Sequence, residues 1–113
     1  MLKTREEQKK LLQEKTCNRP ETSYPERDAI NDIIYDLKIL KDEVERLIKD
    51  PGQARGSVTL KTREWQMELL EAKTCNRPET SGSEREAIGN IINDHRELRE
   101  QIRRFAKRLG INA

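Results

Sequence analysis

The chain is poor in aromatic side chains, which make up 4% of its 113 residues. Hydrophobic residues are 33% and charged residues 39%, a composition unusual for a β-sandwich and usual for long amphipathic helices. No apolar run is long enough to span a bilayer, and no basic start followed by an apolar core indicates a signal peptide. We therefore expect an all-α protein in the cytoplasm that does not contact a membrane.

Cysteine and histidine are scarce as well, with two Cys and one His in the chain. These are too few soft or imidazole ligands for a metal site, so we expect no metal or cofactor. Cys17 and Cys75 do not indicate a disulfide framework, and we expect free thiols. His95 has no second His and no recognisable nucleophile beside it. We therefore expect a protein that is not an enzyme.

What the chain does contain is a duplication. Residues 2–49 align with residues 60–107 without a gap, and 27 of the 48 aligned pairs are identical. The motif KTCNRPETS occurs in both copies. Units of about 50 residues bury too little surface to be stable alone. We therefore expect one domain, 1–113, made of repeat 1 (2–49), a linker (50–59) and repeat 2 (60–109). The uneven divergence of the copies is more typical of drift after duplication than of a designed or fused chain.

Capping signals predict a short and a long helix in each repeat. In repeat 1 we expect helices over about 4–17 and 23–49, separated by a turn whose Asn and Pro stop the first helix. In repeat 2 the equivalent helices cover about 62–75 and 82–109, and Gly110 is the expected C-terminal cap. Thr4 with Glu7, and Ser23 with Glu26, have the spacing of a capping box.

The long helices carry apolar residues at three- and four-residue spacing, as in a coiled-coil seam. The predicted seam consists of Ile30, Ile33, Ile34, Leu37, Leu40, Val44, Leu47 and Ile48 in repeat 1 and Ile88, Ile91, Ile92, Leu98, Ile102 and Phe105 in repeat 2. A linker of about ten residues is too short to run the length of a long helix. We therefore expect an up-down-up-down four-helix bundle with both NRPETS turns at one end. Exchange of hairpins between two molecules is the alternative.

His95 stands at the seam position that Leu37 fills in repeat 1. It is either a polar group that fixes register or a weak point sensitive to pH, or simply a satisfied or partly exposed histidine. If the site faces the core, we expect His95→Leu to stabilise the fold by about 1 kcal/mol or more, because a polar group costs free energy to desolvate.

Two sets of residues are candidates for binding a protein partner. The turns would present a paired polar patch, although capping alone explains most of the motif. The residues of that patch are Asn18, Arg19, Glu21, Asn76, Arg77 and Glu79. Trp65 and Met67 stand where repeat 1 has charged residues. They serve either partner contact or core packing, since helical position cannot separate the two roles.

The end of the second long helix is basic. Its cations are Arg96, Arg99, Arg103, Arg104, Lys107 and Arg108, which with Glu97 and Glu100 leave a net charge of 6 − 2 = +4. They form either a nucleic-acid-binding surface or a solvated helix face. Our first functional hypothesis is therefore a non-enzymatic protein–protein interaction or assembly module, with a partner protein or another copy of the chain. The alternative is a nucleic-acid-binding protein that uses this basic helix.

Overall fold

The regular structure is helical throughout residues 4–49 and 63–110, the parts of the chain that the computed structural model describes. The elements are α1 (Arg5–Leu11), η1 (Leu12–Thr16), α2 (Tyr24–Lys49), α3 (Glu64–Leu69), η3 (Leu70–Thr74) and α4 (Gly82–Leu109). The predicted all-α fold is confirmed for these residues. The predicted linker, 50–59, lies outside them. None of the described helices has a stretch apolar enough to cross a bilayer.

The helix ends follow the predicted caps. Thr4 Oγ1 accepts a hydrogen bond from the Glu7 amide at 3.2 Å. Ser81 and Glu84 form a complete capping box at the start of α4, which satisfies amides that have no partner inside the helix. Gly110 ends α4 at φ 72°, a left-handed conformation that favours glycine.

Both short helices end in a π-helical segment, which was not predicted. The segments η1 and η3 are closed by bonds from the Cys17 amide to Leu12 O and from the Cys75 amide to Leu70 O, both 2.9 Å. A π segment has more residues in each turn than an α-helix and often marks a functional or constrained place. Here it brings Leu12 and Thr16, both fully buried, against α2 and α4.

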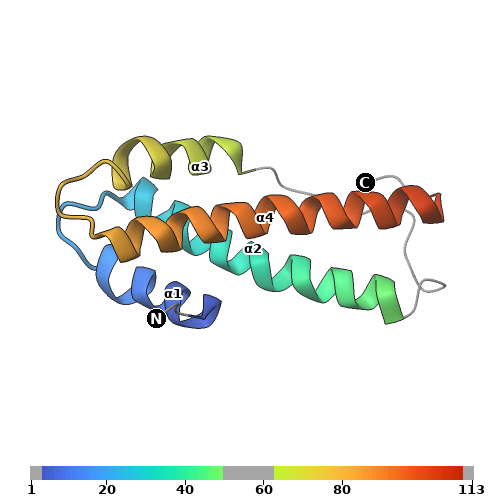
Figure 1. Cartoon of the computed structure of the whole chain (residues 1–113). Helices are drawn as coiled ribbons and strands as arrows, with labels where there is room; N and C mark the ends of the chain where they lie inside the picture. Colours follow the sequence, from blue (N-terminus) through green and yellow to red (C-terminus); the bar gives the residue numbers. More distant parts are fainter. Residues whose placement is uncertain (1–3, 50–62, 111–113) are drawn as a thin grey trace.

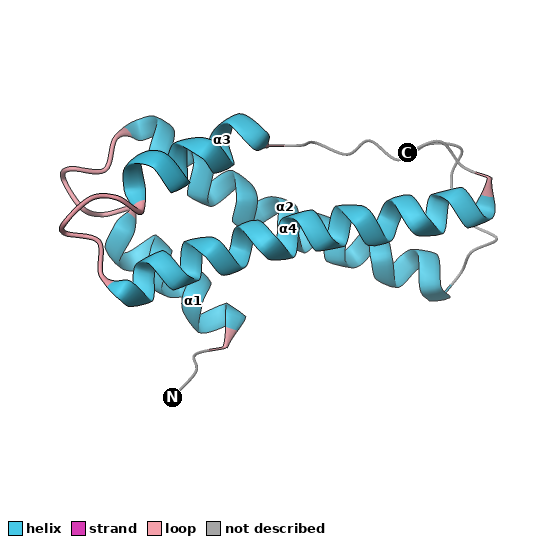
Figure 2. Cartoon of the chain, turned by 45° about the horizontal axis from the view of Figure 1, so that its top comes forward, coloured by secondary structure: helices cyan, strands magenta, loops and turns pink. Residues whose placement is uncertain are grey.

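The two long helices, α2 and α4, pack along each other and form the centre of the molecule (Figure 1). Helix α1 packs mainly on α4, and α3 mainly on α2, so each short helix lies against the long helix of the other repeat. Both NRPETS turns lie at the same end of the molecule (Figures 1 and 2). The short helices lie beside the half of α2 and α4 that is nearer these turns. We call the remaining parts of α2 and α4, residues 40–49 and 98–109, the distal half.

The core has two parts that follow from this arrangement. The larger part lies between all four helices; its buried residues are Leu12, Ala29, Ile30, Ile33, Ile34, Leu37, Met67, Leu70, Ala87, Ile88, Ile91 and Ile92. The smaller part lies in the distal half and consists of Leu40, Val44, Leu47 and Ile102, with Leu98 and Phe105 partly buried beside them. One predicted seam residue is not in the core: Ile48 is 59% exposed. The seam prediction is wrong there because α1 does not reach the distal half.

Candidate interaction surface

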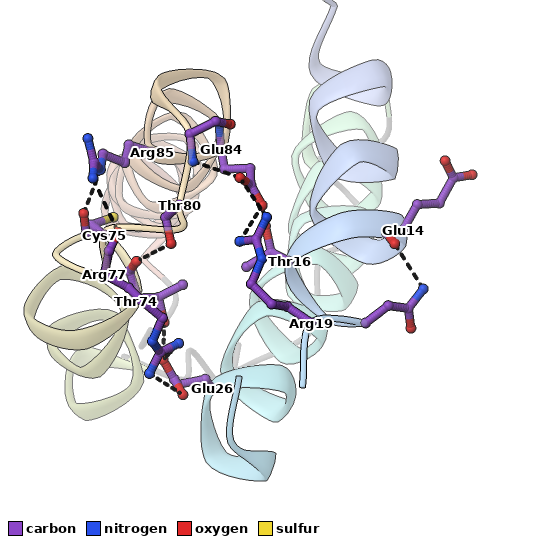
Figure 3. Close-up of polar contacts among 12 residues, drawn as sticks. Glu14, Thr16, Arg19, Glu26, Thr74, Cys75, Arg77, Thr80, Glu84 and Arg85 are labelled. Carbon is purple, nitrogen blue, oxygen red and sulfur yellow. Dashed lines mark hydrogen bonds and ion pairs between the residues drawn. The ribbon is translucent and has the colours of Figure 1, made fainter. Parts of the chain in front are cut away.

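A buried carboxylate at the turn end joins the two repeats. Glu26 is fully buried at the start of α2, where its Oε2 accepts a 2.7 Å bond from the Ser23 amide of its own hairpin. Its Oε1 accepts a 2.7 Å bond from Thr74 Oγ1 and lies 2.9 Å from Arg77 Nη1, both in repeat 2. One side chain thus caps its own helix and binds the other hairpin. Figure 3 shows the contacts of Glu26 with Thr74 and Arg77.

The same arrangement occurs at the equivalent residues of the other repeat. Glu84 accepts a 2.7 Å bond from the Ser81 amide and another of 2.7 Å from Thr16 Oγ1. Arg19 Nη1 lies 3.0 Å from Glu84 Oε1. Figure 3 shows both sets of contacts. The hairpins are therefore held together twice at this end by charge-assisted hydrogen bonds in a buried setting.

These contacts lower the pKa of both carboxyls. Burial by itself would raise the pKa of Glu26, but the bonds from Arg77, Ser23 and Thr74 outweigh it and lower the pKa to about 2. For Glu84, burial is likewise outweighed, chiefly by Thr16, and the pKa is again about 2. Both groups are ionised at neutral pH, so each buried carboxylate meets a cation from the other repeat.

Four of the six predicted turn residues are used inside the domain. Asn18 and Asn76 each donate to the carbonyl of the residue four positions earlier, at 2.9 Å. Arg19 and Arg77 bind the carboxylates described above. The other two residues of this set, Glu21 and Glu79, are exposed. The structure therefore accounts for most of the NRPETS motif through capping and contacts between the repeats.

Acid should unfold the protein through Glu26 and Glu84. Each carboxyl has an ordinary pKa near 4.5 and a pKa of about 2 in the fold, so the unfolded chain binds more protons between these values. The contribution of each group, roughly 3 kcal/mol, is complete above about pH 4.5 and is lost as pH falls toward 2. Thermal melts followed by circular dichroism from pH 7 to pH 2 measure this loss.

The matched control is the Glu26→Gln/Glu84→Gln protein. It should be less stable at pH 7 than the parent and should lose less stability across the acid range. A parent protein whose melting temperature stays constant down to pH 2.5 would contradict the contacts described here.

His95 lies fully buried between α4 and α2, as its seam position predicts. Its Nε2 is 3.0 Å from Asp36 Oδ2. Asp36 also accepts bonds of 2.7 and 3.2 Å from the Arg63 guanidinium of repeat 2. His95 Nδ1 is buried without a hydrogen-bond partner. The imidazole is therefore part of a polar cluster and not an isolated polar group on an apolar seam.

The protonation states in this cluster follow from burial and hydrogen bonding. Burial would raise the pKa of the Asp36 carboxyl, but hydrogen bonds from Arg63 and His95 lower it below its usual value. Burial lowers the pKa of His95, and this effect exceeds the opposing influence of Asp36. At pH 7 a neutral imidazole therefore donates Nε2–H to an ionised carboxylate. The bond to Asp36 changes what we expect of a variant that lacks the imidazole.

We now expect His95→Leu to lower stability at pH 7 by about 1 kcal/mol, because the change removes a hydrogen bond to a buried carboxylate. The parent should also lose stability as pH falls below 6.5, the ordinary pKa of histidine, because the unfolded imidazole takes up a proton more readily. The variant should lack that loss between pH 6.5 and 5. Chemical denaturation at several pH values measures both effects.

An Asp36→Asn background serves as the control for this prediction. There His95→Leu should cost less, since the charged acceptor is absent. A His95→Leu protein that melts above the parent at pH 7 would show that the bond to Asp36 contributes nothing.

The basic residues at the end of α4 do not form one free surface. Arg96 and Arg99 face α3, where Glu64 lies 3.4 Å from Arg96 and 3.9 Å from Arg99. Two more lie close to Glu100: Arg103 at 3.9 Å and Arg104 at 3.8 Å. Lys107 and Arg108 are exposed. The cations are therefore partly neutralised and spread around the helix.

Large exposed apolar residues gather on the flank formed by α2 and α3. Trp65 on α3 is 68% exposed, whereas Met67 is fully buried in the core, so the two candidates have different roles. On α2, Tyr24, Tyr35 and Ile39 are 76%, 63% and 49% exposed. Spacings of eleven and four residues place these three on one face of α2. We call this set, with Trp65, the α2/α3 flank.

The α2/α3 flank is held together by polar contacts next to its apolar residues. Gln66 Nε2 donates a 2.8 Å bond to Asp32 Oδ2. Arg63 binds Asp36, one turn further along α2. These bonds lie on either side of Trp65 in sequence, so α3 presents its Trp65 from a fixed position beside α2.

The equivalent flank, formed by α4 and α1, has none of these apolar residues. At the positions of Tyr24, Tyr35, Ile39 and Trp65 the other copy has, respectively, Gly82, Asn93, Glu97 and Glu7. At all four positions the apolar or aromatic residue belongs to the α2/α3 flank, and the glycine or polar residue belongs to the opposite flank. Comparing the copies at outward-facing positions would have found this set from sequence, but only Trp65 was singled out.

A shallow groove lies between α2 and α4 on the side of α1 and continues into the distal half. Next to α1 it is lined by Arg5, Lys9, Leu37, Leu98 and Gln101, among others, with a volume of about 220 Å³. Beyond the start of α1 the groove has a second part with a volume of about 240 Å³. The residues that line this part are Val44, Ile48, Gln101, Arg104, Phe105 and Arg108. We call this second part the distal groove. Within the part of the chain that the structure describes, the residues lining the distal groove include three apolar side chains, and the two charged ones are arginines.

Cys17 and Cys75 are free and half-buried. Burial raises the pKa of both thiols above the ordinary value, which keeps them protonated and weakly reactive at neutral pH. Within the described ranges, no group of three or more His, Cys, Asp and Glu side chains is placed to hold a metal ion.

Comparison of the chain with protein-family models, with curated proteins and with solved structures finds no match.

Proposed function

We propose that the protein is a non-enzymatic protein–protein interaction or assembly module that acts in the cytoplasm. Two repeated hairpins, packed up-down-up-down as one four-helix domain, present the α2/α3 flank to a partner. The observation that carries the proposal is the difference between two otherwise equivalent flanks. Four exposed positions are aromatic or aliphatic on one flank and glycine or polar on the other.

The composition of the α2/α3 flank is typical of an interface. Trp and Tyr are enriched where proteins bind one another, and they supply much of the binding energy when a partner covers them. Trp65 is the residue most suited to this role because it projects from a short helix that is fixed to α2. Exposed charges of both signs lie on the same elements, among them Asp42 and Glu68 with Lys38 and Arg46. The partner should therefore offer an apolar recess with charged residues around it.

Nucleic-acid binding through the end of α4 has less support. Of the six basic residues, Arg99 is 6% exposed, and three others lie within 4 Å of a carboxylate. Phosphate binding needs cations that are free to replace counterions. Of the six, Lys107 and Arg108 are the two that remain, and two cations are few for a phosphate-binding surface.

Trp65→Glu should abolish binding to the partner without unfolding the protein, because Trp65 is mostly exposed. An affinity-tagged protein mixed with extract of the source cells should retain a defined set of proteins, and Trp65→Glu should reduce that retention at least tenfold. Quantitative mass spectrometry of the retained proteins provides the measurement.

The matched control is Glu7→Ala, at the equivalent position on the opposite flank. It should retain the same proteins as the parent. Equal loss in both variants, or no loss in Trp65→Glu, would show that the α2/α3 flank is not the contact surface.

A further inference from the structure

We propose that the distal groove receives the outer face of α3 from a second copy of this chain, so that copies assemble head to tail. The proposal rests on the proposed function, since it uses the α2/α3 flank as a contact surface and names its partner. The chain then carries both halves of the contact, one on each side of the α2–α4 pair.

The distal groove continues a groove that α1 borders. Closer to the turns, α1 lines that groove together with α2 and α4, and Gln101 lines both parts. Ile48 follows Ile30 by eighteen residues, or five helical turns, and so lies on the same face of α2. Ile30 is fully buried whereas Ile48 is 59% exposed. A helix that continued the line of α1 would cover Ile48.

The outer face of α3 carries apolar side chains, as an occupant of the distal groove must. Trp65 and Leu69 are four residues apart, which places them on one face of α3. That face points away from the core, because Met67 and Leu70 point into it.

The charges of the two surfaces are complementary. Among the described residues that line the distal groove, the charged ones are Arg104, which also lies 3.8 Å from Glu100, and Arg108. Glu68 is exposed beside Trp65 on the outer face of α3. Docking therefore brings a carboxylate next to two guanidinium groups. Pairing of two distal grooves about a two-fold axis would instead place arginines against arginines. Charge therefore favours the groove-to-α3 contact over a symmetric dimer.

The contact joins different surfaces, so it does not close with two copies. The α2/α3 flank lies on the α3 side of the molecule, whereas the distal groove opens on the α1 side. After one contact forms, each end of the pair still has a free surface. Such heterologous contacts build rings or open chains, according to the rotation between neighbours.

The test measures molar mass by light scattering and sedimentation for the full chain and two single variants. Trp65→Glu removes the docking face, and Ile48→Glu removes the groove; both residues are mostly exposed, so both variants should fold. The mass of the parent should rise with concentration beyond two copies of 13.3 kDa. Each variant alone should remain at the mass of one copy.

Mixing the two variants is the decisive step. The Trp65→Glu protein keeps its groove and the Ile48→Glu protein keeps its α3 face, so an equimolar mixture should form a one-to-one complex and stop there. Lys107→Glu, an exposed residue that does not line the groove, is the control and should assemble like the parent. Raising the salt concentration from 0.05 to 0.5 M should weaken assembly at least tenfold.

Three results would overturn the proposal. They are a parent protein that stays at the mass of one copy at millimolar concentration, a mixture of variants that forms no complex, and a dimer that Ile48→Glu abolishes but Trp65→Glu does not. The first result leaves the proposed function open, because capture of a different protein through Trp65 is measured separately. If Trp65→Glu loses that capture but still assembles with itself, the proposed function stands and the groove-to-α3 contact is ruled out.

Discussion

A buried carboxylate that belongs to two hairpins at once is the constraint on which the rest of the fold depends. Glu26 and Glu84 each cap their own long helix and each accept a hydrogen bond from a threonine of the other repeat. A buried charge is tolerated only when it is fully paired. Neither long helix can therefore start in this way unless the other hairpin is in place. The π segments η1 and η3 carry these threonines, Thr16 and Thr74, into the interior.

Sequence patterns predicted the features that depend on local chemistry. Helix ends at Thr4, Ser81 and Gly110 follow from capping, and most of the seam follows from periodicity. Features that depend on a neighbouring element were not predicted. Ile48 has seam periodicity but no helix above it, and the role of His95 depends on Asp36, a residue on another helix. The π segments also escaped prediction, because no residue preference distinguishes them from an α-helix end.

The candidate site was predictable in part. Trp65 was predicted as a contact residue because repeat 1 has a charged residue at the equivalent position. Comparing equivalent positions of the two repeats also identifies the exposed apolar residues of α2. The turn patch was predicted because identical residues occur in both copies. Those residues are identical because they make the contacts between the repeats. After duplication, residues needed to join the copies stay alike, whereas residues on one outer flank are free to differ. We infer that this difference is where the function of the chain lies.

The central claim, that buried carboxylates join the repeats, is tested most directly by a double-mutant cycle. Glu26→Gln, Arg77→Met and the double variant are compared with the parent by urea unfolding at pH 7. The account predicts a coupling energy of about 1.5 to 3 kcal/mol, as for a hydrogen bond to a buried charge. The exposed pair Glu43 and Arg46, 2.6 Å apart within α2, is the reference and should give at most about 0.5 kcal/mol. A coupling energy for Glu26 and Arg77 no larger than that of the reference pair would contradict the account.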